Sequence, residues 1–252
     1  MFTDSHCHLD DPRFDPDRDA VVERAKAAGV DRIIAPAITR ETWPRLQAVC
    51  ARHRQVFPAY GLHPMFMASH QPADIDALAE WLTTQRPLAV GECGLDFQHD
   101  RDSRRRQLDL FDAQLALARQ HDLPVIVHAR KAVEEAIGLI RRHPGVRGVF
   151  HSYGGSYEQA RRLLDLGFFF GIGGPYTWSR SRRLQALLPK LPPDRLLLET
   201  DAPDQPDERH RGQRNEPAFI TEIAAFVARR LDTDIETLAG ITSRNADRLF
   251  FG

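Results

Sequence analysis

The chain has 252 residues, a length that suits one α/β barrel as well as two smaller domains. Its formal net charge is -1, so the overall electrostatic field of the protein does not favour a polyanionic partner, although a local basic patch can still bind one. Three scattered cysteines exclude a disulfide framework or zinc knuckle, and the longest apolar runs are far shorter than the roughly 20 residues of a membrane-spanning helix. The first residues lack the basic and apolar regions of a signal peptide, so we expect a protein of the reducing cytoplasm.

Short apolar runs alternate along the chain with longer amphipathic segments, which is typical of strands followed by helices. The predicted strands span residues 2–6, 32–37, 56–61, 88–92, 124–129, 148–152, 168–173 and 195–201. The predicted helices span residues 18–28, 41–52, 73–84, 102–121, 131–142, 156–166, 180–189 and 216–230, with two short helices at 234–240 and 243–250. Eight strand–helix units predict a single-domain (β/α)8 TIM barrel over residues 1–252. A doubly wound open sheet is the alternative, but no G-x-G-x-x-G turn follows any predicted strand.

The first predicted strand runs into the sequence DSHCHLD, in which two histidines flank Cys7. Side chains alternate between the two faces of a strand, so His6 and His8 should share one face and Cys7 should lie on the other. We expect Cys7 to pack against the helices as a small apolar residue, and the histidines to face the barrel mouth. An H-x-H pair alone is more often an ordinary polar strand end than a metal site.

Other polar residues follow predicted strands at the same end. Glu92 ends the fourth strand, His128 the fifth, His151 the sixth and Asp201 the eighth. A barrel gathers these strand ends at one rim, where the active sites of such enzymes lie. A carboxylate or imidazole at that position is unfavourable unless it is paired, hydrogen-bonded or bound to a metal. The pattern therefore predicts a metal centre at this rim.

The expected ligands outnumber the three or four that a single catalytic zinc takes from a protein. They suit two divalent ions that share Glu92, with His6, His8 and Asp201 on one ion and His128 with His151 on the other. Nitrogen and oxygen ligands fit Zn, Mn, Ni, Co or, more weakly, Mg. Water between the ions would be the nucleophile, and Asp201 is a candidate to accept its proton as well as to bind metal.

Further candidates lie near the expected centre. His63, in the sequence GLHP, is placed to contact a phosphate oxygen or protonate a leaving group, or else to orient a ligand. Arg130 is placed to bind phosphate in a bidentate manner, or else to pair with an acid at the rim. Asp96 is expected to fix the loop after the fourth strand, and Glu199 to orient a ligand. Candidates for stacking on nucleic-acid bases, although packing is the commoner role, are Phe97, Tyr153, Tyr176 and Trp178.

Eight short motifs link these residues to a known family. In chain order they are DSHCHLD at 4–10, GLHP at 61–64, GECGLDF at 91–97, PVIVHAR at 124–130, HSYGG at 151–155, ETDAP at 199–203, NEP at 215–217 and NADRLF at 245–250. Together they resemble the TatD family of metal-dependent deoxyribonucleases, within the amidohydrolase superfamily. The resemblance covers the whole chain and implies a (β/α)8 barrel, a divalent metal centre and hydrolysis of DNA phosphodiester bonds. The metal residues that it implies are the same six positions.

The sequence departs from the family pattern beside two expected ligands. Many members have an aromatic residue and Leu after the D-[SA]-P element, where this chain has Asp204 and Gln205. Many have H-[CW]-F around the sixth-strand histidine, where this chain has Ser152 and Tyr153. The residues at these positions bear on which substrate binds rather than on the metal centre. Their pattern resembles that of a TatD-related subgroup.

The favoured prediction is a nuclease that hydrolyses DNA, single-stranded or at its ends, with no membrane association and no obligate protein partner. A second hypothesis is a metal-dependent hydrolase of a small ester, lactone or amide, with which the near-neutral charge is compatible. A third is a barrel that binds ligands without turnover, which an intact ligand set disfavours.

Overall fold

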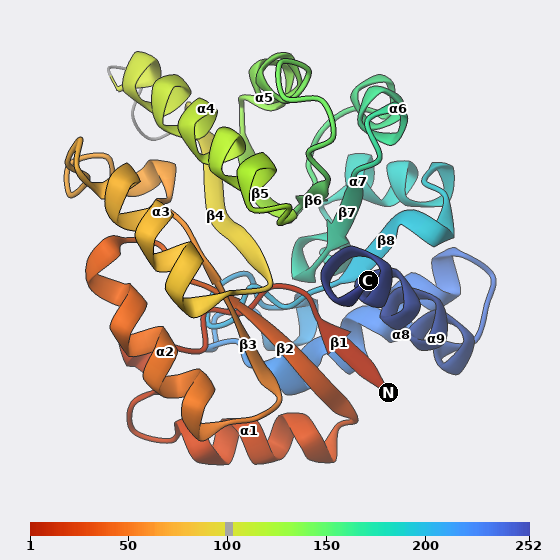
Figure 1. Ribbon diagram of the computed structural model, residues 1–252. Coiled ribbons are helices and arrows are strands. Elements are labelled where there is room, and N and C mark those ends of the chain that lie inside the picture. Colours follow the sequence, from red (N-terminus) through yellow and green to blue (C-terminus); the bar gives the residue numbers. More distant parts are fainter. Residues whose placement is uncertain (99–102) are drawn as a thin grey trace.

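Eight parallel strands in chain order form the centre of the molecule in the computed structural model, which describes residues 1–98 and 103–252 (Figure 1). The strands are β1 Phe2–Asp4, β2 Val30–Pro36, β3 Val56–Tyr60, β4 Ala89–Asp96, β5 Val125–Arg130, β6 Gly148–Phe150, β7 Phe169–Ile172 and β8 Leu196–Leu198. Each strand pairs with the next along the chain, whereas the strand order of a doubly wound sheet reverses. The predicted barrel is therefore confirmed.

Backbone hydrogen bonds join the first and last strands just beyond their regular ends. The Ser5 amide donates to the Leu198 carbonyl at 3.0 Å, and the Asp201 amide donates to the His6 carbonyl at 2.8 Å. Cys7 and Ala202 form an isolated parallel bridge in the same region. The segments after β1 and β8, which carry expected ligands, are thus held side by side.

Helices surround the strands, as Figure 1 shows. They are α1 Arg18–Ala27, α2 Trp43–Arg52, α3 Asp74–Gln85, α4 Arg104–Gln120, α5 Val133–Ile140, α6 Tyr157–Asp165, α7 Arg182–Leu187, α8 Ile220–Arg230 and α9 Ile235–Ala246. Short 3-10 turns occur at η1 Pro12–Phe14, η2 Arg40–Thr42, η3 Pro64–Phe66, η4 Gly174–Thr177, η5 Leu188–Lys190, η6 Pro193–Arg195, η7 Glu208–His210 and η8 Pro217–Phe219. The first predicted residue of the helix over 102–121 lies outside the described residues.

One helix prediction was wrong. The two short helices expected at 234–240 and 243–250 are a single helix, α9, which continues into a π-helical turn at Asp247–Phe251. The side chain of Asp234 accepts a hydrogen bond from the Thr237 amide and caps the start of α9. Gly240 does not break the helix, because residues on both sides of it, such as Leu238 and Ala246, are buried.

The apolar core has two parts. The larger part fills the layer between strands and helices and includes Cys7, as predicted from the alternation in the first strand. The smaller part fills the barrel interior and consists of Ile34, Ala59, Ala89, Ile126, Val149, Phe169, Leu197, Ala246, Leu249 and Phe250. Its last three members come from the C-terminal segment, which lies over the middle of the barrel in Figure 1. The Asn245 side chain donates to the carbonyl of Leu196, so this segment closes the amino end of the barrel.

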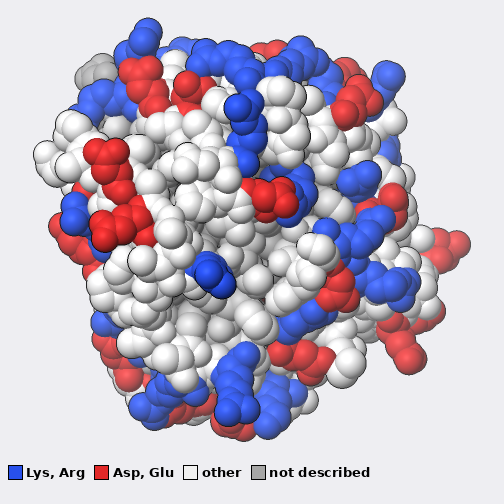
Figure 2. All heavy atoms as spheres, in the orientation of Figure 1, with Lys and Arg blue, Asp and Glu red and all other residues white. Residues whose placement is uncertain are grey.

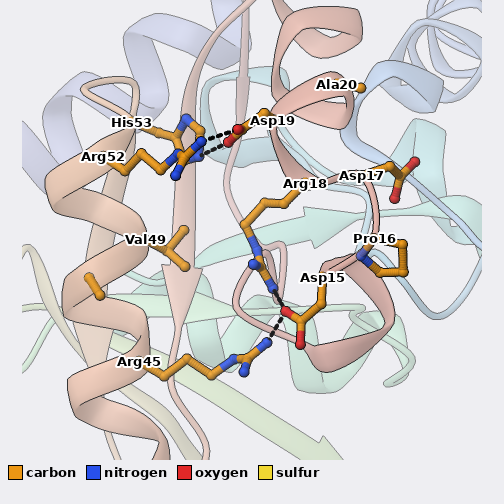
Figure 3. Close-up of a pocket in the computed structure, with 11 residues that line it drawn as sticks. Asp15, Pro16, Asp17, Arg18, Asp19, Ala20, Arg45, Val49, Arg52 and His53 are labelled. Atoms are coloured by element: carbon orange, nitrogen blue, oxygen red, sulfur yellow. Dashed lines mark hydrogen bonds and ion pairs between the residues drawn. The ribbon is translucent and has the colours of Figure 1, made fainter.

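Positive and negative side chains are not separated on the face seen in Figure 2, where blue and red groups mix around the edge of the view. A surface hollow beside α1 and α2 is lined by such groups (Figure 3). Asp15 pairs with Arg18 and Arg45, and Asp19 pairs with Arg52 and His53, so these charges compensate one another. Among the described residues, no helix combines the length and apolar character needed to cross a bilayer.

Candidate metal centre

The six predicted ligands meet at the carboxyl end of the barrel, around the side chain of Glu92. Glu92 and His128 lie within β4 and β5, whereas His6, His151 and Asp201 lie just after shorter strands than predicted. Beyond the sixth and eighth strands the backbone turns out of the extended conformation: Ser152, directly after His151, has φ 45° and Asp201 has φ 56°.

Two glycines allow β4 to approach β5 closely at this point. A Cβ on Gly91 would lie 2.7 Å from the Cβ of Ile126 on β5. Gly94 has φ +132°, and a Cβ there would lie 2.1 Å from the carbonyl oxygen of His128. Only glycine fits these two positions of the GECG motif, which carries Glu92 between its neighbours.

The first cluster of ligand atoms consists of His6 Nε2, His8 Nε2, Asp201 Oδ1 and Glu92 Oε2. The His6 nitrogen lies 3.2 Å from that of His8, 3.2 Å from the Glu92 oxygen and 3.4 Å from the Asp201 oxygen. The His8 nitrogen lies 3.3 Å from Glu92 and 3.5 Å from Asp201. Ligands of a tetrahedral ion with bonds of about 2.0–2.1 Å are about 3.3–3.4 Å apart. The spacing of the His6, His8 and Glu92 atoms therefore fits one cation, and Asp201 Oδ1 lies within reach of both histidines.

The second cluster forms around the other oxygen of Glu92. Its Oε1 lies 2.8 Å from His151 Nε2 and 3.1 Å from His128 Nδ1, and these two nitrogens are 3.2 Å apart. The same oxygen lies 3.0 Å from His63 Nε2. The two oxygens of Glu92 thus face different sets of ligand atoms, as the two-ion prediction requires.

Hydrogen bonds to two of the imidazoles leave the nitrogen that faces the cluster free to bind a cation. His8 Nδ1 lies 3.1 Å from the carbonyl oxygen of Pro36, which can only accept, so the proton is on Nδ1. His128 Nε2 lies 2.9 Å from Asp96 Oδ2, which favours the tautomer with Nδ1 deprotonated. Asp96 also accepts from the Gln98 amide, as the loop-fixing prediction implies. Its contact with His128 was not predicted, because spacing along the chain gives no sign of it.

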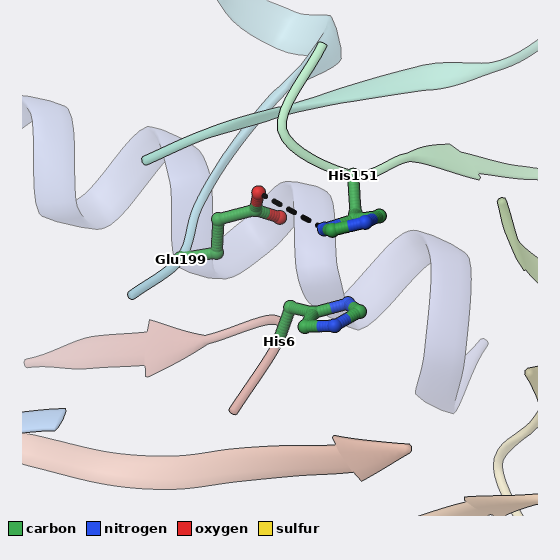
Figure 4. Close-up of side chains that lie close together, drawn as sticks. All are labelled: His6, His151 and Glu199. Atoms are coloured by element: carbon green, nitrogen blue, oxygen red, sulfur yellow. Dashed lines mark ion pairs between the residues drawn. The ribbon is translucent and has the colours of Figure 1, made fainter. Parts of the chain in front are cut away.

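The rings of His6 and His151, one from each cluster, stack with centroids 4.0 Å apart and planes 14° apart (Figure 4). Glu199 Oε1 lies 3.7 Å from His151 Nδ1, so Glu199 places negative charge beside the outer nitrogen of this ring. Within the described part of the chain, the Nδ1 atoms of both rings and Glu199 Oε2 are buried without a hydrogen-bond partner.

The two buried acidic side chains of the centre, Glu92 and Asp201, require positive charge beside them. Burial alone would raise the pKa of Glu92, but the neighbouring histidines hold it well below its ordinary value. Burial also opposes ionisation of Asp201, yet His8 and His6 lower its pKa to about 2. Both groups are therefore carboxylates at neutral pH, and a buried pair of carboxylates needs cations or protonated imidazoles nearby.

His63 contacts Glu92 as a neutral ring. Burial lowers the pKa of His63 to about 4. The Met65 amide donates to its Nδ1 at 3.0 Å, so the proton of the neutral ring is on Nε2, which faces Glu92 Oε1. This geometry favours the hypothesis in which His63 orients Glu92 over the one in which it protonates a leaving group.

A groove of about 820 Å³ leads away from the second cluster. It is lined by the candidate ligands His128 and His151 and by Arg130, whose side chain is exposed. Trp178 also lines the groove and is half-buried, with the Arg180 guanidinium 4.9 Å from its ring centroid. The stacking expectation is wrong for the other three aromatic residues, which pack in the interior: Phe97, Tyr153 and Tyr176.

Comparisons with known proteins agree with a metal centre. A family model described as "TatD related DNase" matches residues 3–251. The chain is 38% identical over 253 residues to the "Uncharacterized metal-dependent hydrolase YjjV" of Escherichia coli K12, with 99% of this chain and 97% of the relative covered. It is 36% identical to the "3'-5' ssDNA/RNA exonuclease TatD" of Rahnella sp. Y9602, with 96% and 95% covered. A crystal structure of the YjjV protein superposes with a TM-score of 0.95 at 36% identity, covering 100% of this chain and 98% of that one.

Proposed function

Because this chain belongs to the TatD-related DNase family of metal-dependent hydrolases, we propose that it hydrolyses DNA phosphodiester bonds with two divalent cations. The predicted family and the predicted enzyme class are thereby confirmed, whereas the number of ions and the residue roles are proposals. The observation that carries the proposal is the division of Glu92, whose Oε2 faces His6 and His8 and whose Oε1 faces His128 and His151.

The proposed ligand sets follow the two clusters. His6, His8 and Asp201 hold one cation, His128 and His151 hold the other, and Glu92 is shared by both. When bound, two such ions activate water for attack and stabilise the charge on the entering and leaving oxygens of a phosphodiester. Nitrogen and oxygen donors suit Zn, Mn, Ni, Co or, more weakly, Mg.

Side chains around the centre supply the remaining parts of the proposed reaction. His63 donates from Nε2 to Glu92 and keeps its carboxylate between the two ligand sets. Arg130, at the wall of the groove, contacts the phosphate of the substrate through its guanidinium. Asp201 is the candidate to receive the proton of the attacking water.

The groove supports single-stranded DNA, or a DNA end, as the substrate. It opens directly from His128 and His151 and offers the ring of Trp178 to a base. The relative in Rahnella that is named a single-strand exonuclease agrees with this choice. We propose no obligate protein partner and a site of action in the reducing cytoplasm, which the absence of paired cysteines among the described residues supports.

The test is an assay of metal-free protein, reconstituted with each candidate metal, on end-labelled single-stranded DNA beside a panel of small esters, lactones and amides. We expect DNA cleavage that stops with chelator and returns with added metal. The Glu92→Gln variant should be inactive, and the Glu80→Gln variant, changed at an exposed residue on α3, should match the parent. Rapid ester turnover with intact DNA would replace the nuclease by the small-molecule hydrolase, and inactivity on every substrate would support the binding protein.

A further inference from the structure

A hydrogen-bonded bridge joins the loops that follow β6 and β8 at the carboxyl end of the barrel. The Ser152 hydroxyl donates to Gln205 Oε1 at 2.8 Å. The Gln205 amide nitrogen in turn donates to Asp201 Oδ2. Three residues from two separate loops are therefore connected in one chain of hydrogen bonds that ends on an expected metal ligand.

All three residues of the bridge have a left-handed backbone. Ser152 has φ 45°, Gln205 has φ 47° and Asp201 has φ 56°. This conformation is uncommon for residues other than glycine, and it persists only where surrounding contacts hold it. Such residues gather at functional sites, so three of them bonded to one another indicate a selected arrangement rather than a loop that happens to pack there.

The bridge also connects the two ligand clusters. Asp201 Oδ1 faces His6 and His8 of the first cluster. Ser152 directly follows His151 of the second cluster, and its amide donates to Glu199 Oε1. Because each loop carries one ligand, a change in the bridge alters how the Asp201 carboxylate is aimed relative to the second cluster.

We propose that Gln205 is a positioning residue, held by Ser152, that turns Asp201 so that it offers a single oxygen to the first cation. This inference rests on the proposed metal centre. The amide holds Oδ2, which leaves Oδ1 alone to bind and prevents both oxygens from contacting the ion. Proton acceptance by Oδ2 then requires the Gln205 hydrogen bond to move. A second consequence follows from the groove, whose wall includes both Ser152 and Gln205, so the bridge also limits how substrate approaches.

The test measures cation binding directly, by titrating metal-free protein with Co²⁺ or Zn²⁺ against a chelating dye and following the Co²⁺ absorption spectrum. Gln205→Leu keeps the size of the side chain and removes its hydrogen bonds. We expect one of the two equivalents to bind about 10–100-fold more weakly, with a changed Co²⁺ spectrum, while the other equivalent is unchanged. Gln213→Leu makes the same chemical change at an exposed position of the same long loop and should behave as the parent.

Ser152→Ala keeps the inference falsifiable if Gln205→Leu folds poorly, and the double variant tests whether the two residues act as one unit where Gln205→Leu folds. Ser152→Ala removes only the hydroxyl and should weaken the same equivalent to a smaller extent. The double variant should bind metal as Gln205→Leu does, because both changes break one unit. Unchanged binding of both equivalents in Gln205→Leu, or in Ser152→Ala where Gln205→Leu does not fold, would overturn the role of the bridge, as would additive effects in the double variant. The expected differences in metal binding, found in a protein whose parent form does not cleave DNA, would instead overturn the nuclease proposal and leave the bridge standing.

Discussion

Nε2 of His128 lies 2.9 Å from Oδ2 of Asp96, and this contact turns the Nδ1 atom of the ring toward Glu92. A carboxylate that binds the outer nitrogen of a metal-binding histidine fixes its tautomer and orientation and makes it a stronger ligand. Asp96 is therefore as much a part of the proposed centre as the side chains that would touch the cations.

Replacement of Asp96 by Ala should weaken the binding of one cation by about 10–100-fold, because His128 then loses its fixed orientation. The affinity is measured by competition with a chelating dye. Asp207→Ala is a matched control, since Asp207 is another buried acid and lies 2.6 Å from the ring of His210, outside the two clusters. Equal affinities in the Asp96→Ala variant and the parent would remove Asp96 from the centre.

The shared position of Glu92 predicts a distinct outcome for Glu92→Gln. The side-chain amide of Gln can present its oxygen to only one cluster. It presents its nitrogen to the other cluster, and an amide nitrogen cannot bind a cation. We expect the metal content, measured by elemental analysis after gel filtration, to fall to one ion per chain or fewer. Two tightly bound ions in this variant would show that Glu92 does not bridge them.

Asp4 should make the stability of the fold depend on pH. Burial raises the pKa of Asp4 from 3.8 to about 7, even though Thr200 and the His6 amide donate hydrogen bonds to its carboxylate. Between these two pH values the folded chain binds more protons than the unfolded chain, so this contribution to stability is lost as pH rises from about 4 to 7. The loss amounts to at most about 4 kcal/mol.

The Asp4→Asn variant tests this contribution. Its amide can accept from the Thr200 and His6 amides and donate to the Thr200 hydroxyl, without an ionising group. The free energy of unfolding of the variant relative to that of the parent should be larger at pH 8 than at pH 4. Urea unfolding of the metal-free proteins at both pH values measures it. A stability difference between variant and parent that is the same at both pH values would contradict the assignment.

The C-terminal segment should contribute to stability without affecting catalysis. Phe250 fills the amino end of the barrel interior, far along the strands from the ligand clusters. Phe250→Ala should destabilise the fold by about 3–5 kcal/mol, because it leaves a cavity in the interior. Phe251→Ala, at the neighbouring residue that is 38% exposed, should change the stability much less. Unfolding by urea measures both, and kcat on DNA below the unfolding range should equal that of the parent.

Trp178 distinguishes a nucleic-acid substrate from a small one. If bases stack on its ring, Trp178→Ala should raise KM for single-stranded DNA by about 5–150-fold, since stacking is worth about 1–3 kcal/mol per base. Tyr157→Ala, at an exposed ring outside the groove lining, provides the control. A KM equal to that of the parent would show that the groove binds DNA without Trp178.

The predicted site was most complete where it depended on strand ends. Glu92, His128, His151 and Asp201 each follow an apolar run, and a barrel necessarily brings such positions to one rim. The structure places them around a common centre with His6 and His8. Their roles as ligands remain predictions until metal binding is measured.

For the aromatic residues, position after a strand does not predict exposure at the groove. Tyr153 and Tyr176 follow the sixth and seventh strands, yet the Tyr176 hydroxyl donates to the Tyr153 carbonyl in the interior. Whether a loop side chain turns inward or toward the groove depends on which other loops lie above it. Neighbouring sequence does not contain that information.

Local patterns were sufficient for the strand–helix alternation, the barrel and the approximate position of the expected metal ligands. Apolar periodicity and the place of a residue along its strand are properties of short segments, and barrel geometry converts them into a shared rim. The contacts of Asp96 with His128, of His63 with Glu92 and of Gln205 with Ser152 required the folded chain. These pairs join residues 29 to 53 positions apart, and their donor–acceptor distances of 2.8–3.0 Å are set only by the packing of whole loops.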